Sequence, residues 1–432
     1  MRRAILTAGA IIASVTLLAG CSANGGTANT DSSGPVKLTF WDWDPGMDSI
    51  VDVWNKAHPD IQVKLANPAG GDELVSKLIT AHKAGNAPDI TKVEYQSLPA
   101  LVSNGVAADI SDYTADSAKD FGKAALSQVQ FEDKTYGVPQ DFAPLVFFYR
   151  QDVFDSLGLK APTTWDEYAA AAATIHAADP TKYLGTFSAG DPGWFAGLTQ
   201  QAGANWWSAK GKDWTVDIKD APSTKVADYW RGLIDQGVIK GDPFWSAQWN
   251  KEMDDGTLVG WISGAWAPAQ FGGIAPNTVG KWTMTSLPAW TAGDKTTGIW
   301  GGSAISVTTD SKHPKQAAEF VNWLNTSDEA LALQVEKINI FPAATSGQKL
   351  DALTKPPAFM PNQPDYYKTI ADIAADARSF DIWGPNATVT FGAYKDGFAA
   401  AIQNKTSFSD VLGTMQDTTV TDMKKLGFTV NK

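Results

Sequence analysis

The chain has 432 residues, enough for two or more domains, and its 47 acidic and 35 basic side chains give a formal net charge of -12. Because no basic run or cluster interrupts this acidic balance, the sequence argues against a nucleic-acid partner. The four histidines lie far apart without metal-ligand spacing, and no nucleophilic-serine, Walker or dinucleotide-binding glycine motif is present. We therefore expect no metal and no cofactor.

The N-terminus has the features of a secretory signal. Two early arginines precede a short apolar stretch over 4–19, which is too short and too weakly apolar for a dependable membrane span. The stretch leads into a Leu-Ala-Gly-Cys motif that ends at Cys21, the only cysteine, and this motif resembles the lipobox of bacterial lipoproteins. The resemblance implies a signal peptide over 1–20 and lipidation of Cys21. The alternative is an ordinary secreted protein with an incidental cysteine.

Residues 22–34 are small and polar and show no apolar periodicity, which is typical of a disordered segment. We expect 21–35 to form the lipidated cysteine and a flexible tether, the other interpretation being a bound N-terminal arm. No later stretch reaches about 18 consecutive apolar residues, so no other membrane span is predicted. A lipid anchor suits a cell without an outer membrane, so we expect the outer face of a Gram-positive cytoplasmic membrane.

Strand and helix patterns alternate in the first part of the mature chain. Apolar residues alternate over 36–40 and over 61–65, and 89–93 has the composition of a third strand. Between these strands, helical spacing predicts helices that include Met47 and Leu74. This β-α-β-α-β order indicates a parallel sheet flanked by helices.

Ligands of such sheets bind in the crevice beyond the carboxyl ends of the strands. That rule selects Trp43 and Asp44 after the first strand, and Tyr95 and Gln96 after the third. We expect these four residues to contact a ligand. Trp41, directly at the end of its strand, is expected to pack against the protein instead.

Further along the chain, 145–149 is a strongly apolar strand, and an alanine-rich helix is predicted over 165–178. Thr164 is its expected N-cap, with a capping-box glutamate three residues later. The middle section is dense in Trp, Gly and Pro and is followed by a strand over 304–307. The last third is predicted to be mostly helical and to end near Leu426.

Eight short motifs, taken in their order, resemble the extracellular solute-binding proteins of carbohydrate ABC importers, the maltose-binding-protein-like group. Those motifs are KLTFW (37–41), HPDIQV (58–63), NAPDI (86–90), YGVP (136–139), FYRQD (148–152), PTTWDE (162–167), ISGAW (262–266) and AAEFVNWL (317–324). The resemblance implies an α/β, two-lobed periplasmic-binding-protein-like fold of class II. Each lobe would be a mainly parallel sheet flanked by helices, and a hinge would connect the two lobes.

The same resemblance implies that the chain crosses between lobes more than once, near 141–144 and again near 298–301. Sugar would bind in the cleft, and the lobes would close on it. The implied N-terminal lobe is 36–142 plus 302–345, and the implied C-terminal lobe is 143–301 plus 346–432.

Eighteen tryptophans are far above the usual share of this residue, and they suit a sugar. A pyranose has an apolar face of C–H groups, which an indole ring covers, and a rim of hydroxyls, which carboxylates and amides serve. Trp266 matches the Gly-x-Trp position at which the family's aromatic ring stacks on sugar. Asp141 lies at the predicted hinge and Trp300 at the second crossing. At Tyr95 the family supplies a polar contact, but this chain has no carboxylate there.

Three more tryptophans lie in Gly- and Pro-rich loops: Trp194, Trp245 and Trp383. Each is expected to be either a sugar contact or a packed loop anchor. We expect three others, at helical spacing, to be core residues: Trp165, Trp230 and Trp323. The full predicted substrate-binding set is Trp43, Asp44, Tyr95, Gln96, Asp141, Trp194, Trp245, Trp266, Trp300 and Trp383.

The expected function is that of a non-enzymatic, monomeric, lipid-anchored receptor that delivers an oligosaccharide to the transmembrane subunits of an ABC permease. One alternative is a secreted glycoside hydrolase, which needs two carboxylates roughly 5–10 Å apart, and 47 acidic residues leave that possibility open. The other alternative is a binding protein for a non-sugar solute such as a polyamine or a phosphodiester.

Overall fold

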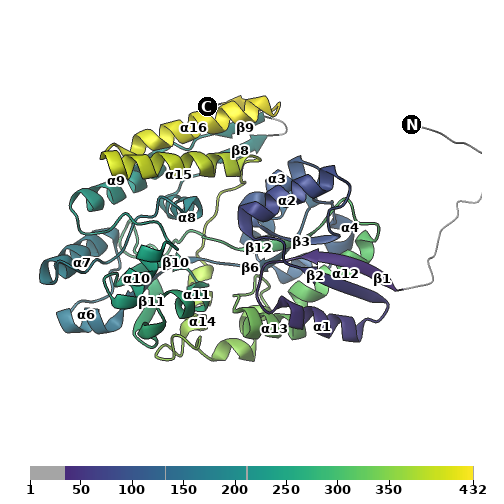
Figure 1. Ribbon diagram of the computed structural model, residues 1–432, viewed down its shortest axis with the longest axis horizontal. Coiled ribbons are helices and arrows are strands. Elements are labelled where there is room, and N and C mark those ends of the chain that lie inside the picture. The colour runs from purple at the N-terminus through teal and green to yellow at the C-terminus, as the bar shows by residue number, and fades with distance from the viewer. Residues whose placement is uncertain (1–34, 132, 211–212, 432) are drawn as a thin grey trace, which may run out of the picture. The chain divides into compact units, whose positions relative to one another are not determined.

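The computed structural model describes residues 35–131, 133–210 and 213–431. The predicted signal peptide, Cys21 and nearly all of the predicted tether lie outside this part of the chain. The described part contains two main sheets, each with its own helices (Figure 1). None of the helices within these ranges is long and apolar enough to cross a membrane.

The first sheet has five strands in the order β2-β1-β3-β12-β6. β1 pairs in parallel with β2 and β3, as the β-α-β-α-β pattern predicts, whereas β12 runs antiparallel to both β3 and β6. Its strands are β1 (Val36–Trp41), β2 (Ile61–Ala66), β3 (Ile90–Glu94), β6 (Val138–Asp141) and β12 (Ser303–Val307).

Helices cover both faces of this sheet. In β3, Ile90 belongs to the core that α1 and α12 share with the sheet, and Val93 belongs to the core under α2 and α3. Residues three apart in a strand point to opposite faces, so the two cores lie on opposite sides. The elements around the sheet are α1 (Met47–Ala57), α2 (Gly71–Lys83), α3 (Leu98–Ser103), α4 (Ser111–Thr114), α5 (Lys123–Ser127), the hairpin β4 (Gln130–Phe131) and β5 (Lys134–Thr135), α12 (Pro314–Thr326) and α13 (Asp328–Ile338).

The second sheet is antiparallel. Its central strand β7 (Leu145–Arg150) is buried along its whole length and pairs antiparallel with β10 (Gly260–Gly264) and with β11 (Trp282–Ser286). The expectation of a mainly parallel sheet is therefore wrong for this half of the molecule. The reason is tertiary: β10 and β11 reach β7 from distant parts of the chain, so local periodicity carries no sign of their direction.

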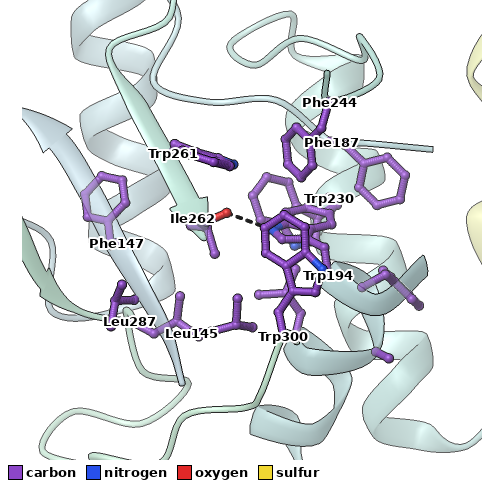
Figure 2. Close-up of a cluster of buried hydrophobic side chains, with 14 of the residues drawn as sticks. Leu145, Phe147, Phe187, Trp194, Trp230, Phe244, Trp261, Ile262, Leu287 and Trp300 are labelled. Carbon is purple, nitrogen blue, oxygen red and sulfur yellow. Dashed lines mark hydrogen bonds between the residues drawn. The ribbon is translucent and has the colours of Figure 1, made fainter. Parts of the chain in front are cut away.

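A core dense in aromatic rings packs beside the second sheet. Figure 2 shows Trp194, Trp230 and Phe187 together, with Trp261 on the strand β10 nearby. The rings of Trp194 and Trp230 meet nearly edge to face, with centroids 5.1 Å apart, an arrangement that favours aromatic pairs. Around this core lie α6 (Gln151–Leu157), α7 (Trp165–Ala178), α8 (Pro192–Ala202), α9 (Ala221–Asp235), α10 (Ala247–Asp255) and α11 (Ala267–Ile274).

α7 begins where the sequence predicts. The hydroxyl of Thr164 accepts a hydrogen bond from the Glu167 amide at 3.2 Å, as an N-cap does. The Glu167 carboxylate returns to the amide of Thr163, at 2.7 Å, rather than to the amide of the cap residue. Trp165 and Trp230 are buried, so the core prediction is confirmed for both, whereas Trp323 is half-buried and packs against the first sheet's core.

The C-terminal third is mostly helical, as predicted, and α15 and α16 lie side by side (Figure 1). A small third sheet has β9 at its centre, antiparallel to β8 and parallel to β13. The elements of this region are β8 (Trp207–Lys210), β9 (Asp213–Val216), α14 (Tyr366–Ala374), α15 (Ala387–Asn404), α16 (Phe408–Lys425) and β13 (Thr429–Asn431).

Two chain segments connect the main sheets, and they lie side by side. The first leads from β6 into β7, and the second leads from β11 into β12. Pro144 and Ile299 form an antiparallel bridge between them, the Leu145 amide donates to the Gly298 carbonyl at 2.8 Å, and the Trp300 amide donates to Ala143 at 3.0 Å. These paired segments place residues of both sheets around one opening.

Candidate functional site

A cavity of about 310 Å³ lies at the carboxyl ends of β1, β3 and β6, where the open-sheet rule places a ligand. Its volume falls at the lower end of the range of about 300–1,000 Å³ that is usual for small-molecule sites. We call it the central cavity. Its lining residues are Trp43, Asp44, Lys92, Glu94, Asp141, Asp191, Trp245, Trp266, Ala269, Gln270, Trp300, Gly301, Gly302, Ser303, Ile338, Asn339 and Ile340.

The side of the cavity next to the first sheet is charged. The ammonium group of Lys92, on β3, is buried and forms an ion pair with the carboxylate of Asp44. The same ammonium lies over the ring of Trp43, 4.8 Å from its centroid, which is a cation–π contact. Burial lowers the pKa of Lys92, but the surrounding carboxylates outweigh burial and raise it overall. We call this side the charged wall.

Asp42 lies behind the charged wall and is only 1% exposed. One carboxylate oxygen accepts a hydrogen bond from the Asp44 amide at 2.6 Å, and the other has no partner among the described residues. Burial, together with the nearby negative charge of Asp44, raises the pKa of Asp42 to about 7. The ordinary value is near 4, so this carboxyl holds its proton over much of the acidic range.

Asp141 ends β6 at the same wall. Its carboxylate accepts a hydrogen bond from the hydroxyl of Ser303, and its backbone carbonyl accepts one from the hydroxyl of Tyr95 at 3.0 Å. Burial raises the pKa of Asp141, although the charge of Lys92 and the Ser303 hydrogen bond oppose that rise. The charged wall therefore holds oriented hydrogen-bond acceptors whose charge one ammonium group partly balances.

Indole rings form the opposite side of the cavity, which we call the aromatic wall. The Trp266 indole donates to the backbone carbonyl of Trp300 at 2.9 Å, and the two ring centroids are 4.8 Å apart. Trp245 lies 6.1 Å from Trp266 between centroids and is 41% exposed, which is unusual for so large an apolar side chain. An exposed indole beside a fixed indole offers apolar area to a ligand.

One carboxylate serves the aromatic wall. Asp191 caps the N-terminus of α8, where its carboxylate accepts a hydrogen bond from the Trp194 amide at 3.2 Å, and it lines the cavity together with Trp245 and Trp300. Burial raises the pKa of Asp191 to about 6, and the hydrogen bond from Trp194 and the charge of Lys395 limit the rise. Asp191 thus adds an acceptor beside the indoles.

Two glycines let the second connecting segment pass between the walls. Gly301 and Gly302 have φ values of 92° and 94°, in the left-handed region that side chains disfavour. A β-carbon on Gly302 would lie 2.7 Å from the ring of Tyr95, and one on Gly301 would lie 3.0 Å from the Trp266 indole nitrogen. The Gly-Gly pair therefore keeps both walls close to the segment.

The structure brings six of the ten predicted binding residues together around the central cavity. The neighbours that the sequence argument missed are Lys92, Glu94, Asp191 and Gln270. The sequence does point to Glu94, because this residue ends the third predicted strand directly before the candidates Tyr95 and Gln96. The six residues brought together are Trp43, Asp44, Asp141, Trp245, Trp266 and Trp300.

Three predicted residues border a separate hollow of only about 20 Å³. Tyr95 is buried, and the amide of Gln96 donates to Glu94 at 2.9 Å. The Trp383 indole donates to the side chain of Gln128 at 3.2 Å, so it links the C-terminal region to the first half of the chain. These residues flank the central cavity but do not line it.

Trp194 does not belong to the site. Its side chain has no exposed surface, and its indole donates to the Ile262 carbonyl at 3.1 Å, as Figure 2 shows. Asp191 begins a helix here, and the first turn of that helix turns Trp194 into the core. The prediction that Trp194 contacts substrate is therefore corrected to a packing role. Trp41 packs against the first sheet's core, as predicted.

Within the described ranges, no three His, Cys, Asp or Glu side chains are grouped so that they could hold a metal ion. The cavity instead offers hydrogen-bond acceptors on one side and apolar ring surface on the other. That combination matches an amphipathic ligand with a polar rim and an apolar face.

Comparison with known proteins agrees with this geometry. The profile of the family described as "Bacterial extracellular solute-binding protein" matches residues 41–331. Among curated proteins, the arabinooligosaccharide-binding protein of Bacillus subtilis is 28% identical over 331 residues, which cover 72% of this chain and 74% of that protein.

Solved structures are similar over nearly the whole chain. The galacto-N-biose-/lacto-N-biose I-binding protein of a Bifidobacterium longum ABC transporter, in complex with lacto-N-biose, has a TM-score of 0.84 and 32% identity, over 93% of this chain and all of that one. An ABC-transporter-associated binding protein of B. animalis subsp. lactis, in complex with β-1,6-galactobiose, has a TM-score of 0.81 and 28% identity, over 92% and 100%. The chain thus has the two-domain fold of ABC-transporter binding proteins and belongs to the bacterial extracellular solute-binding protein family.

Proposed function

We propose that this protein captures an oligosaccharide in the central cavity and hands it to an ABC permease. The observation that carries the proposal is the pairing of the two walls. Fixed acceptors on the charged wall suit sugar hydroxyls, and the indoles of the aromatic wall suit the C–H face of a pyranose. The two solved structures named above support the same ligand class, because they are described in complex with lacto-N-biose and with β-1,6-galactobiose.

In this proposal the six predicted residues that line the cavity divide into two roles. Trp266 and Trp245 stack on sugar, with Trp300 behind them, and Trp43 covers the opposite side. Asp44 and Asp141 accept hydrogen bonds from hydroxyls. Among the residues missed from sequence, Asp191 and Glu94 add acceptors, and Gln270 is exposed at the rim. The ligand is thus held by hydrogen bonds across its edge and by contact on its faces.

We also propose that the two main sheets mark two lobes, 36–142 with 302–345 and 143–301 with 346–432, which close on the ligand. The paired connecting segments support this division, because they run together at the edge of the cavity. Closure would be driven by contacts that the ligand makes with both walls at once. A closed, loaded monomer is the form that the permease would recognise.

For the N-terminus we propose cleavage before Cys21 and lipidation of that residue, which would anchor the receptor on the outer face of a Gram-positive cytoplasmic membrane. The support is the lipobox-like motif and the extracellular character of the family. Cys21→Ser should release the protein into the medium, and mass spectrometry of the wild-type N-terminus should show the lipid. An unmodified N-terminus at another position would contradict the anchor.

A solute panel tests the ligand class. The panel contains arabino-oligosaccharides, lacto-N-biose, β-1,6-galactobiose, maltodextrins and a polyamine. A ligand at 100 times its dissociation constant stabilises the folded state by about 2.7 kcal/mol, so binding raises the melting temperature. We expect at least one oligosaccharide to do so and to change tryptophan fluorescence. A shift with the polyamine and with no sugar would overturn the proposal.

The same mixtures test whether the protein acts only as a receptor. After long incubation, chromatography should recover each bound oligosaccharide intact. Release of shorter sugars would instead assign hydrolysis to the carboxylates of the cavity, since a glycosidase needs only two of them.

A further inference from the structure

A second hollow of about 330 Å³ adjoins the central cavity. The two spaces share Trp266, Ala269 and Asn339 in their linings, so the indole of Trp266 stands at the boundary between them. We call the second space the apolar hollow. A ligand that stacks on Trp266 in the central cavity therefore has the apolar hollow directly beside it.

The lining of the apolar hollow differs from that of the central cavity. No residue that lines it carries a charge, and its walls include the rings of Phe341, Phe359, Tyr366 and Tyr367. The central cavity, by contrast, contains four carboxylates and a lysine. A cationic or anionic group would find no oppositely charged partner in the apolar hollow, which therefore favours a neutral occupant.

Two polar groups remain free to serve such an occupant. Within the described part of the chain, neither the amide group of Asn339 nor the hydroxyl of Tyr367 makes a hydrogen bond. The Tyr366 hydroxyl, in contrast, is held by the Ala265 carbonyl at 2.6 Å. The backbone holds Asn339 firmly, since it ends α13 in the left-handed conformation with φ of 55°. Aromatic faces with a few free polar groups again match a sugar ring.

The apolar hollow also borders a third space. Tyr367 lines both this hollow and a wider, more open groove of about 530 Å³, whose other lining residues include Lys349, Asp365 and Lys368. Tyr367 thus stands between the apolar hollow and the groove, as Trp266 stands between the apolar hollow and the central cavity.

We propose that the apolar hollow is a second subsite, which holds a further neutral sugar unit of the oligosaccharide bound in the central cavity. The proposal rests on the proposed function and extends it, because it makes ligand length a determinant of affinity. Trp266 contacts both units, and the additional unit buries its C–H face against the rings of the hollow. The protein then binds three- and four-unit sugars more tightly than two-unit sugars of the same series.

Two neighbouring glycines on α11 offer a matched pair of variants. A β-carbon on Gly272 or on Gly273 meets no atom within 4 Å, and both positions are exposed. Only Gly272 lines the apolar hollow. Gly272→Phe therefore fills the hollow, whereas Gly273→Phe adds the same side chain to the same helix outside it. Gly272→Leu repeats the test with a smaller side chain should the phenylalanine variant fold poorly.

The experiment measures affinity by titration calorimetry for arabino-oligosaccharides and β-1,6-galacto-oligosaccharides of two to five units. In the series that binds, we expect the wild-type protein to gain about tenfold in affinity beyond two units. Gly272→Phe should remove this gain and leave disaccharide affinity within about twofold of the wild type. Gly273→Phe should bind every length as the wild type does.

Equal affinity of the wild type for all lengths would overturn the subsite and leave the proposed function intact. So would an equal loss in both glycine variants, or no loss in Gly272→Phe. Failure of the wild type to bind any sugar, disaccharides included, would overturn the proposed function and the subsite together.

Discussion

On one wall of the central cavity, the strands of the first sheet fix carboxylates and an ammonium group. On the other wall, loops around the second sheet present indole rings. The charged wall owes its geometry to backbone pairing, since β1 and β3 are hydrogen-bonded neighbours that end at the same edge. The aromatic wall owes its geometry to ring packing and to hydrogen bonds such as that from Trp266 to Trp300.

This difference indicates how the two walls divide recognition. Hydrogen bonds need accurate direction, which paired strands supply, whereas a ring face tolerates sliding and can belong to a loop. The charged wall would therefore select the pattern of hydroxyls, and the aromatic wall would supply much of the affinity. Variants in each wall should separate these contributions, because loss of charge pairing affects stability and loss of a ring affects binding.

The largest effect is expected for Lys92→Met on the charged wall. The Lys92 side chain is 4% exposed and that of Asp44 15%, so the variant leaves carboxylates in a desolvated site without their counter-ion. Removal of one partner from a buried ion pair typically costs about 3–5 kcal/mol, and we expect about 3 kcal/mol. Urea denaturation at pH 7.5 measures this change in the free energy of unfolding.

Lys134→Met is the matched control for Lys92→Met. Lys134 pairs with Asp109 at 3.6 Å, but both side chains are largely solvated, so the loss should stay below about 0.5 kcal/mol. If the two lysine variants lose similar stability, the charged wall is not a desolvated network.

On the aromatic wall, Trp266→Ala should weaken sugar binding by about tenfold or more. An aromatic anchor in a cavity centre is a typical hot spot, and this indole lies between the central cavity and the apolar hollow. Trp290→Ala serves as control, because Trp290 packs against Trp165 and does not line either space. Titration by intrinsic fluorescence gives both affinities. Unchanged affinity for Trp266→Ala would make this residue a packing residue.

Asp42→Asn should change the pH dependence of stability. The folded-state pKa is about 7, above its ordinary value near 4, so between these values the folded protein holds a proton that the unfolded chain has lost. Unfolding then releases protons, and the contribution of Asp42 to stability falls as pH rises from about 4 to 7. The asparagine variant has no titrating carboxyl at this position, so its stability does not fall in this way. Its melting temperature relative to wild type should therefore rise with pH over that window.

Each pKa unit corresponds to about 1.4 kcal/mol. Between pH 4 and pH 7.5, the stability of Asp42→Asn relative to the wild type should therefore rise by at least about 1.4 kcal/mol. Asp109→Asn gives the opposite sign, because hydrogen bonds from Ser111 lower the pKa of Asp109. Its stabilising effect is present above the ordinary pKa and is lost as pH falls. Parallel curves for the wild type and Asp42→Asn would contradict the buried, proton-holding carboxyl.

The sequence predicted the residues of the charged wall that directly follow the end of a strand. It did not predict the residue whose burial depends on an ion pair with another part of the sheet. Trp43 and Asp44 follow directly from the end of β1. Lys92 gave no signal, because a lysine inside a strand is ordinarily solvent-facing, and only the approach of Asp44 from β1 makes its burial tolerable.

For the aromatic wall, loop position was an incomplete guide. Trp245 and Trp266 line the cavity as predicted, but Trp194, in an equally Gly- and Pro-rich stretch, is a core residue. Only the helix that Asp191 caps turns its ring inward. The antiparallel course of the second sheet was hidden for a similar reason, since β7 meets partners that lie more than a hundred residues away.

The smallest effect is expected for Tyr95→Phe, which tests whether Tyr95 supports the charged wall or touches the ligand. The hydroxyl donates to the Asp141 carbonyl at 3.0 Å and is buried, so its removal should cost about 1 kcal/mol of stability. Affinity should stay within about twofold, because Tyr95 does not line the central cavity. Tyr113→Phe, at a 40% exposed position, should change neither quantity. A tenfold loss of affinity at unchanged stability would return Tyr95 to the binding set, and the charged wall would then extend past the end of β3.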